Sequence, residues 1–306
     1  MRAARIAELG ATPEPVELDG DGALEVVAVA LNPLDLAVAA GRFYGGHPPL
    51  PYVPGCEAIA RGDGGRLHLF GDGRGTVKDG FLVERVDFPE ELAVRVPDGL
   101  DDAAAAACGI AGMAGWAPVA MRAPVRADDR VLVLGATGTV GSIAVQAARV
   151  LGAERVVAVG RDEDKLRRSL ELGADATVIL DGGDLAERFR QAFDGEGPTL
   201  VVDPLWGEPA QAAIEAAAPR ARIVQLGQSA GPEATLASSV VRGKQLSILG
   251  YSDFVQTPEE KRELYLGLAE HVAAGRITLD VETFGLEDVG RAWATQADGR
   301  KAVVVL

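Results

Sequence analysis

Three glycines near the middle of the chain have a spacing that suits a bound phosphate group. Residues 130–151, RVLVLGATGTVGSIAVQAARVL, run from an apolar, β-branched stretch through Gly135, Gly138 and Gly141 into an amphipathic stretch of helical period. Small residues between a strand and a helix let the backbone approach a pyrophosphate, and the helix amino terminus offers unpaired N–H groups and a positive dipole end. This order predicts a nucleotide site.

The segments after this turn must position it within a sheet. A second apolar run ends at Gly160, and further strands are expected at 176–180, 200–203, 222–226 and 246–251, with helices beginning near Asp184, Glu208 and Leu236. Strands that alternate with helices build parallel sheets. We therefore expect an α/β unit with a six-stranded, doubly wound parallel sheet.

The first 96 residues have a different hydrophobic pattern. Their apolar runs are short and are broken by Gly and Pro, which is typical of a β-rich barrel or sandwich. Strands are expected at 26–31, 58–61, 66–70, 75–78, 81–86 and 92–96, and loops at 32–35, 41–46 and 51–57. A helical stretch at 101–121 leads into the nucleotide unit.

The end of the chain does not extend the nucleotide unit comfortably. After residue 251 we expect a long helix at 258–274, a short helix at 286–296 and a terminal strand at 302–306.

Composition limits the class of protein. The chain has 306 residues, 48% hydrophobic and 25% charged, so we expect two domains. The formal net charge of −15 disfavours nucleic acid and anionic membranes as partners. The sequence has no signal-peptide pattern and no run of about 20 apolar residues, so a cytoplasmic location is expected. Cys56 and Cys108 are too few for a secreted disulfide framework and are interpreted as free thiols.

Five ordered motifs suggest a known family. They are Asn32-Pro33-Leu34-Asp35, Pro51-Tyr52-Val53-Pro54-Gly55-Cys56-Glu57, Ala111-Gly112-Met113-Ala114-Gly115-Trp116, residues 135–146, and Gly299-Arg300-Lys301-Ala302-Val303-Val304. Together they cover nearly the whole chain. They resemble the medium-chain dehydrogenase/reductase superfamily, and within it the zinc-free quinone oxidoreductase (zeta-crystallin-like) branch.

The resemblance implies a GroES-like catalytic domain at 1–115, completed by 255–306, and a Rossmann NADPH-binding domain at 116–254. It also implies a cofactor cleft between the domains and hydride transfer to a small-molecule quinone or enone acceptor. A homodimer through the sheet edge at 246–251 is a further implication.

The residues after the second strand bear on the choice of dinucleotide. A Rossmann fold that selects NADH usually has an acidic residue where this chain has Gly160, and Arg161 and Lys165 form a cationic pair suited to a 2′-phosphate. We predict NADPH. The alternative takes Asp162 as the ribose acceptor, although helix capping explains that residue better, and Arg161 could equally be a solvated surface residue. The expected cofactor-binding residues are Ala136, Gly138, Thr139, Val140, Gly141, Gly160, Arg161, Lys165, Leu226, Gly227 and Tyr251.

The metal ligands of zinc-dependent relatives are largely replaced in this sequence. The resemblance places Asn32 at the first ligand position, Cys56 at the second and Cys108 at or near the third. Zinc-dependent relatives carry Cys, His and Cys at these three positions. Loss of the first Cys and of the His resembles the zinc-free members, so no metal is expected. The alternatives are zinc held by the two thiols with Glu57 or Asp35, and a disulfide between the thiols.

Without a metal, charge that develops on the acceptor oxygen requires hydrogen-bond donors. The expected catalytic residues are Tyr44, Tyr52 and Asn32. Tyr44 matches the family position when counted back from Gly55, whereas counting forward from Gly41 places Phe43 there. The resemblance implies that Asn32 orients the substrate or the nicotinamide-side ribose.

We therefore expect an NADPH-dependent, zinc-free oxidoreductase acting on a quinone or an α,β-unsaturated carbonyl compound. Three alternatives remain open: a nucleotide-binding protein of this fold without turnover, a zinc-dependent alcohol dehydrogenase and a methyltransferase. The last is disfavoured because the glycine turn comes after a β-rich domain.

Overall fold

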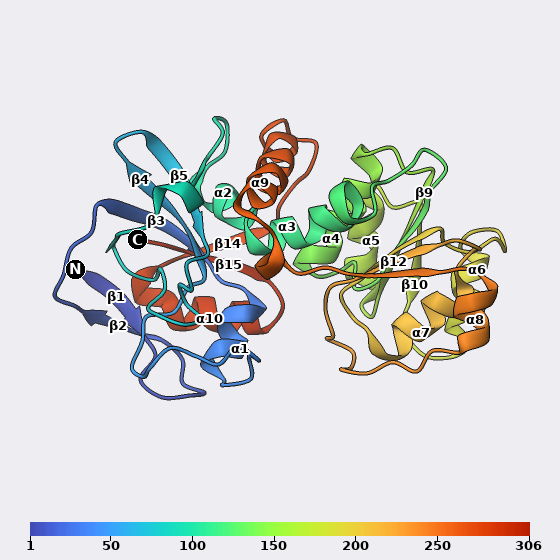
Figure 1. The fold of residues 1–306 in the computed structure, drawn as a ribbon, viewed down its shortest axis with the longest axis horizontal. Helices are drawn as coiled ribbons and strands as arrows, with labels where there is room; N and C mark the ends of the chain where they lie inside the picture. Colours follow the sequence, from blue (N-terminus) through green and yellow to red (C-terminus); the bar gives the residue numbers. More distant parts are fainter. The chain divides into compact units, whose positions relative to one another are not determined.

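The computed structural model describes residues 1–306 and divides into two compact units (Figure 1). One unit comprises Met1–Met113 together with Gln256–Leu306, and the other comprises Ala114–Val255. The division expected from the sequence differs from these limits by one or two residues. No helix combines the length and the apolar character needed to cross a membrane.

The unit Ala114–Val255 contains one parallel sheet. Its strands are β8 (Arg130–Val133), β9 (Arg155–Gly160), β10 (Ala176–Ile179), β11 (Leu200–Asp203), β12 (Arg222–Gln225) and β13 (Ser247–Gly250). The spatial order is β10-β9-β8-β11-β12-β13, and every neighbouring pair is parallel. The six-stranded doubly wound prediction is confirmed. The strand order reverses between β8 and β11, where a ligand crevice is expected at the carboxyl ends of the strands.

Helices cover both faces of this sheet (Figure 1). They are α4 (Thr139–Val150), α5 (Glu163–Glu171), α6 (Leu185–Gln191), α7 (Gly207–Ala216) and α8 (Ser238–Gly243). Because parallel connections are right-handed, α4 and α5 lie on one face and α6, α7 and α8 on the other. The inner strands are buried on both faces, which explains their continuous apolar sequences.

The other unit is built on a mostly antiparallel sheet. Its strands are β3 (Leu24–Ala30), β4 (Glu57–Gly62), β5 (Gly65–Phe70), β6 (Arg85–Val86), β7 (Val94–Arg95), β14 (Val281–Gly285) and β15 (Lys301–Val305). The order is β14-β15-β3-β4-β5-β7, with β6 also paired to β3. A separate two-stranded sheet pairs β1 (Arg2–Arg5) with β2 (Glu14–Glu17). Because β15 pairs with β3, the end of the chain completes the first unit, as the GroES-like prediction required.

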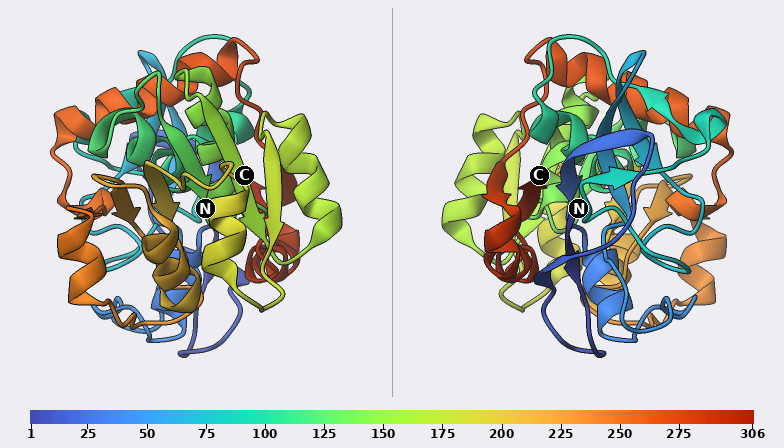
Figure 2. Two further views of the ribbon diagram at one scale, coloured as in Figure 1. Left: turned by 90° about the vertical axis from the view of Figure 1, so that its right-hand side faces the viewer. Right: turned by 90° about the vertical axis from the view of Figure 1, so that its left-hand side faces the viewer.

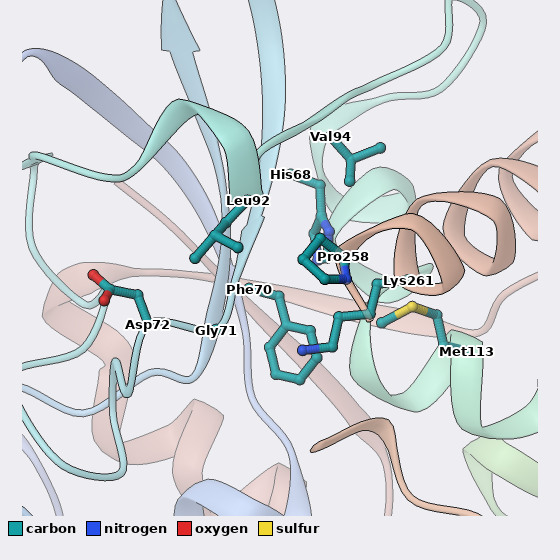
Figure 3. Close-up of a pocket in the computed structure, with 9 residues that line it drawn as sticks. All are labelled: His68, Phe70, Gly71, Asp72, Leu92, Val94, Met113, Pro258 and Lys261. Atoms are coloured by element: carbon teal, nitrogen blue, oxygen red, sulfur yellow. The ribbon is translucent and has the colours of Figure 1, made fainter. Parts of the chain in front are cut away.

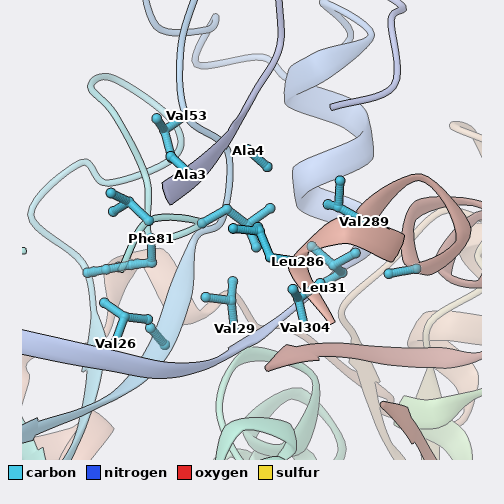
Figure 4. Packing of buried hydrophobic residues seen from close by; sticks show 14 of the residues in the cluster. Ala3, Ala4, Val26, Val29, Leu31, Val53, Phe81, Leu286, Val289 and Val304 are labelled. Carbon is cyan, nitrogen blue, oxygen red and sulfur yellow. The ribbon is translucent and has the colours of Figure 1, made fainter. Parts of the chain in front are cut away.

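Five helices accompany this sheet. They are α1 (Pro33–Ala39), α2 (Asp102–Ala107), the first part of α3 (Ile110–Ala117), α9 (Pro258–Ala273) and α10 (Val289–Ala297). Of these, α2 and α10 contact its strands. Figure 2 shows α10 as a red coil beside the terminal strand, and the two are in contact. Figure 4 shows the core between them, where Val29, Leu31 and Val304 meet Leu286 and Val289.

Two local predictions were wrong. Residues 75–78 form a turn rather than a strand, because Gly73 and Gly75 have φ of +69° and +73° and the N–H groups of Val77 and Lys78 bond to the Gly73 carbonyl. Residues 32–35 are not a loop, since Asn32 caps α1 and Asp35 completes the capping box. The helical prediction for 101–121 is confirmed, although the stretch is divided into α2, α3 and a π-helical turn, Pro118–Arg122.

Candidate functional site

The glycine turn joins β8 to α4 at the carboxyl end of the sheet. Gly135 has a φ of +63°. A Cβ on Gly141 would lie 2.2 Å from the Gly135 carbonyl oxygen, so the helix packs directly on the turn. A Cβ on Gly138 would meet nothing closer than 3.6 Å. Gly138 therefore offers the open backbone position that a pyrophosphate needs, at the amino terminus of a twelve-residue helix. These residues fit a dinucleotide.

The end of β9 has no room for an acidic residue. A Cβ on Gly160 would lie 2.8 Å from Thr137 Cγ2 and 3.2 Å from Leu166 Cδ2. Asp162 caps α5, and its Oδ1 accepts a hydrogen bond from the Lys165 backbone N–H at 3.1 Å. The capping explanation of Asp162 is confirmed. The side chains of Arg161 and Lys165 are exposed.

The remaining predicted cofactor residues also follow strands of this sheet. Ala136 is buried, and its N–H donates to the Val159 carbonyl at 2.8 Å. Thr139 and Val140 open α4. Leu226 and Gly227 follow β12, and Tyr251 follows β13, where its hydroxyl donates to Asp253 Oδ1 at 2.5 Å. All of these residues thus lie at the carboxyl edge of the sheet.

Asp203 is a candidate that the sequence analysis missed. It ends β11, beside β8, and is fully buried. Its Oδ1 accepts hydrogen bonds from the N–H groups of Leu205 and Trp206 at 2.9 and 2.8 Å, whereas its Oδ2 has no partner. Burial raises the pKa of Asp203 to about 6. A charged residue at the end of an otherwise apolar strand was the signal that could have found it.

Glu57 is the centre of a buried polar cluster in the other unit. Its Oε1 accepts a hydrogen bond from Asn32 Nδ2 at 2.8 Å, and its Oε2 accepts one from the Ile110 backbone N–H at 2.6 Å. Oε2 also lies 3.2 Å from His68 Nε2, and Lys301 Nζ lies 3.7 Å from Oε1. Burial raises the pKa of Glu57, but the His68 hydrogen bond and the Lys301 charge outweigh it, so the pKa is lowered overall.

Asn32 lies inside this cluster rather than at a surface. It is 1% exposed, and its Nδ2 donates both to Glu57 and to the Ala30 carbonyl at 3.1 Å. Its Oδ1 accepts a hydrogen bond from Lys301 Nζ at 2.7 Å. An amide nitrogen has two hydrogens, and both are used within the chain.

The two candidate tyrosines have opposite environments. Tyr44 is 87% exposed, and its ring contacts that of Phe43, with centroids 4.5 Å apart. Tyr52 is 1% exposed, and its hydroxyl has no hydrogen-bond partner. Burial, followed by the charges of Asp35 and Cys56, raises the pKa of Tyr52 above its usual value.

A small cavity of about 70 Å³ opens beside His68 (Figure 3). His68 stacks on Tyr265, with ring centroids 4.4 Å apart, while Phe70, Met113 and Lys261 line the opening. Lys261 Nζ lies 4.6 Å from the centre of the Phe70 ring. Neither His68 nor Lys301 has a sequence pattern that marks a site, because each is a polar residue in a mostly apolar strand.

The residues of this cluster do not fit a zinc ion. Burial and the nearby Asp35 raise the pKa of Cys56, and burial and Glu57 raise the pKa of Cys108 to about 12, so both thiols are neutral in this environment. No group of three or more His, Cys, Asp or Glu side chains could hold a metal ion. Both thiols are free and buried.

Comparison with known proteins gives one family model and several relatives. Residues 139–269 match the model described as zinc-binding dehydrogenase. The chain is 28% identical over 291 residues to a phenolphthiocerol/phthiocerol polyketide synthase of Mycobacterium tuberculosis, covering 90% of this chain and 13% of that protein. It is 32% identical over 217 residues to a mycocerosic acid synthase-like polyketide synthase of Mycolicibacterium smegmatis, covering 68% of this chain and 10% of the relative. The chain thus spans only 10 to 13% of the length of these relatives.

Solved structures resemble the whole chain. An NAD-dependent alcohol dehydrogenase is 29% identical with a TM-score of 0.86, and all of both chains is covered. The quinone oxidoreductase of Thermus thermophilus, solved also with NADPH, is 26% identical with a TM-score of 0.81, again over all of both chains.

Proposed function

We propose that this chain, which belongs to the medium-chain dehydrogenase/reductase superfamily and to its quinone-oxidoreductase-like branch, is an NADPH-dependent reductase that needs no zinc. Its acceptor is a quinone or an α,β-unsaturated carbonyl compound. The observation that supports this most directly is the open glycine turn at the carboxyl end of β8, with Arg161 and Lys165 beyond the end of β9.

The choice of NADPH depends on two features at the end of β9. Thr137 and Leu166 occupy the space that a side chain on Gly160 would need, so no carboxylate at that position competes with a 2′-phosphate. Arg161 supplies a planar donor group and Lys165 a second positive charge, and both are exposed. Bound at the glycine turn, the reduced nicotinamide dinucleotide would supply the hydride.

The acceptor requires hydrogen-bond donors for the charge that develops on its oxygen. Tyr44 presents an exposed hydroxyl. Tyr52 has a hydroxyl without a partner, and its raised pKa keeps it protonated. In this proposal the exposed Tyr44 hydroxyl donates to the acceptor, whereas the Tyr52 hydroxyl is buried and the Asn32 amide is fully bonded within the Glu57 cluster.

The relatives support two acceptor classes. A quinone is suggested by the Thermus enzyme, whereas the mycobacterial relatives are named as synthases of polyketides and of acids. For proteins that synthesise polyketides and acids, the matching reducible acceptor is an unsaturated acyl compound. Both are α,β-unsaturated carbonyl systems, so one mechanism serves both.

We also propose a homodimer formed through the edge of the parallel sheet. Strand β13 is the last strand of the sheet, and no residue from 231 to 250 is buried, although this segment includes all of α8 and β13. An open strand edge invites pairing with a second strand. Analytical ultracentrifugation of the wild type and of an Ile248→Pro variant tests the proposal, because proline removes the N–H group that strand pairing uses. A monomeric wild type would contradict it.

Nucleotide titrations test the cofactor assignment. We expect NADPH to bind at least tenfold more tightly than NADH, and Arg161→Ala to weaken NADPH while leaving NADH unchanged. Arg167→Ala is the matched control, since Arg167 is an exposed arginine on α5, the helix that follows Arg161, and pairs with Asp164. Tighter binding of NADH by the wild type would overturn the NADPH assignment.

Turnover assays test the reaction. We expect steady NADPH oxidation with members of a panel of quinones, enones and enoyl thioesters, without added metal and in the presence of a chelator. Binding without turnover across the panel would favour a nucleotide-binding protein instead. If the purified protein held one zinc ion per chain, and removing that zinc abolished activity, the alcohol dehydrogenase alternative would be favoured.

A further inference from the structure

Lys301 places a positive charge deep inside the first unit. The residue opens β15 and is 2% exposed. Its Nζ donates to the Leu31 carbonyl at 2.9 Å and to Asn32 Oδ1 at 2.7 Å, and it lies 3.7 Å from Glu57 Oε1. A buried ammonium ion is unfavourable unless it is paired and hydrogen-bonded, so this cation has a defined site.

The groups around Lys301 come from distant parts of the chain. Asn32 begins α1, Glu57 begins β4 and Lys301 begins β15. Glu57 is bound in turn by the N–H group of Ile110, which begins α3, and by His68 of β5. One carboxylate and one ammonium group therefore hold together the starts of four elements and the middle of a fifth.

The contacts also fix the orientation of the Asn32 amide. An amide can be turned by 180° about its last bond, which exchanges its donor and acceptor ends. Here the ammonium group faces Oδ1 and the carboxylate faces Nδ2, so only one orientation satisfies both charges.

We propose that the Lys301 ammonium group takes the place of a metal ion in this cluster, because it balances the charge of Glu57 and bonds to Asn32. Lys301 is thus a positioning residue for Asn32 and Glu57. The donors at this place do not suit zinc, and the charge opposite Glu57 is supplied by the chain itself. The expected effect on turnover rests on the proposed function, whereas the expected cation site does not.

A charge-specific rescue tests this inference. Lys301→Ala removes three carbons and the ammonium nitrogen, which n-propylammonium matches in size and charge, and 1-propanol matches in size alone. We expect Lys301→Ala to melt several degrees lower than the wild type, and n-propylammonium to raise its melting temperature with saturation. It should have no such effect on the wild type or on Lys261→Ala, the control on α9. Equal rescue by 1-propanol, or no saturable rescue, would overturn the inference.

A second comparison applies if Lys301→Ala does not fold. Lys301→Met keeps an unbranched side chain that is only one atom shorter and leaves Glu57 without its cation, and adding Glu57→Gln then removes the unpaired charge. We expect the double variant to melt higher than Lys301→Met alone. A double variant that melts at the same temperature or lower would refute the role of charge.

Kinetic parameters separate this inference from the proposed function. In Lys301→Met, kcat should fall at least tenfold while the dissociation constant for NADPH stays within twofold, because the glycine turn belongs to the other unit. Unchanged kcat would refute the positioning role. A wild type without turnover would refute the proposed function, yet the melting experiments would still decide whether the cation site exists.

Discussion

Gly141 and Gly138 lie three residues apart in the same turn but face different surroundings, so their substitution should separate folding from binding. A Cβ on Gly141 would lie 2.2 Å from the Gly135 carbonyl oxygen and 2.7 Å from Ala136 Cα, where ordinary contacts begin at 3.4 Å. Relieving the first overlap requires the turn and α4 to separate by about 1.2 Å, the difference between the two distances. Overpacking of this kind costs about 1–3 kcal/mol.

Gly141→Ala is therefore expected to lose both stability and nucleotide binding. The unfolding free energy should fall by about 1–3 kcal/mol. NADPH should bind at least tenfold more weakly, a loss of about 1.4 kcal/mol, because the glycine turn and the start of α4 have moved apart. Urea unfolding can be followed by the fluorescence of Trp116 and Trp206, which both belong to the nucleotide unit.

Gly138→Thr should affect binding alone. Its Cβ would meet only the Gly135 carbonyl oxygen, at 3.6 Å, its backbone is extended, and Thr caps helices about as well as Gly. Stability should change by less than about 0.5 kcal/mol. NADPH should bind at least tenfold more weakly, since the added side chain occupies the open position. If Gly138→Thr bound NADPH like the wild type, the phosphate would not lie at this turn.

Three further predictions concern single positions. Burial raises the pKa of Asp203 from 3.8 to about 6, so the folded state binds more protons between these values and stability falls as the pH rises through them. Asp203→Asn should therefore remove about 2 kcal/mol of the difference in unfolding free energy between about pH 4.5 and about pH 7.5, and an unchanged pH dependence in urea titrations would contradict this. Gly109→Ala should lower the unfolding free energy of the first unit by about 3–5 kcal/mol, because the added Cβ would overlap Glu57 Oε2 and break the buried cluster. In the control Gly243→Ala the added Cβ meets nothing within 4 Å, so the unfolding free energy should change by less than about 0.5 kcal/mol. Tyr44→Phe should lower kcat about tenfold without changing NADPH binding if its hydroxyl donates to the acceptor, and wild-type kcat would remove Tyr44 from the mechanism.

The nucleotide unit was predictable because its signals are local. The apolar runs and the glycine spacing predicted six parallel strands, and the capping pattern at Asp162 predicted the start of α5. Such features depend on neighbours within a few residues, so periodicity and turn chemistry reveal them. The wrong strand prediction at 75–78 also concerns local features, because Gly73 and Gly75 have positive φ and make this segment a turn.

The Glu57 cluster was not predictable from local pattern. Sequence resemblance pointed to Asn32 but not to its surroundings, and Lys301 lies 269 residues away from it in the chain. Only the pairing of β15 with β3 brings the ammonium group to Asn32. His68 is a polar residue in a mostly apolar strand, and only the pairing of β5 with β4 makes it a buried partner of Glu57.

The sequence by itself determined the strand and helix order of the nucleotide unit, the phosphate-binding turn and the absence of an acid at Gly160, because each depends on the size and polarity of adjacent residues. The tertiary structure decided that Thr137 fills the space beside Gly160, that Asp203 is buried with one oxygen unpaired, and that Lys301 faces Asn32 and Glu57. Burial and charge pairing arise from segments far apart in the chain, and they take effect only when the sheet has brought those segments together.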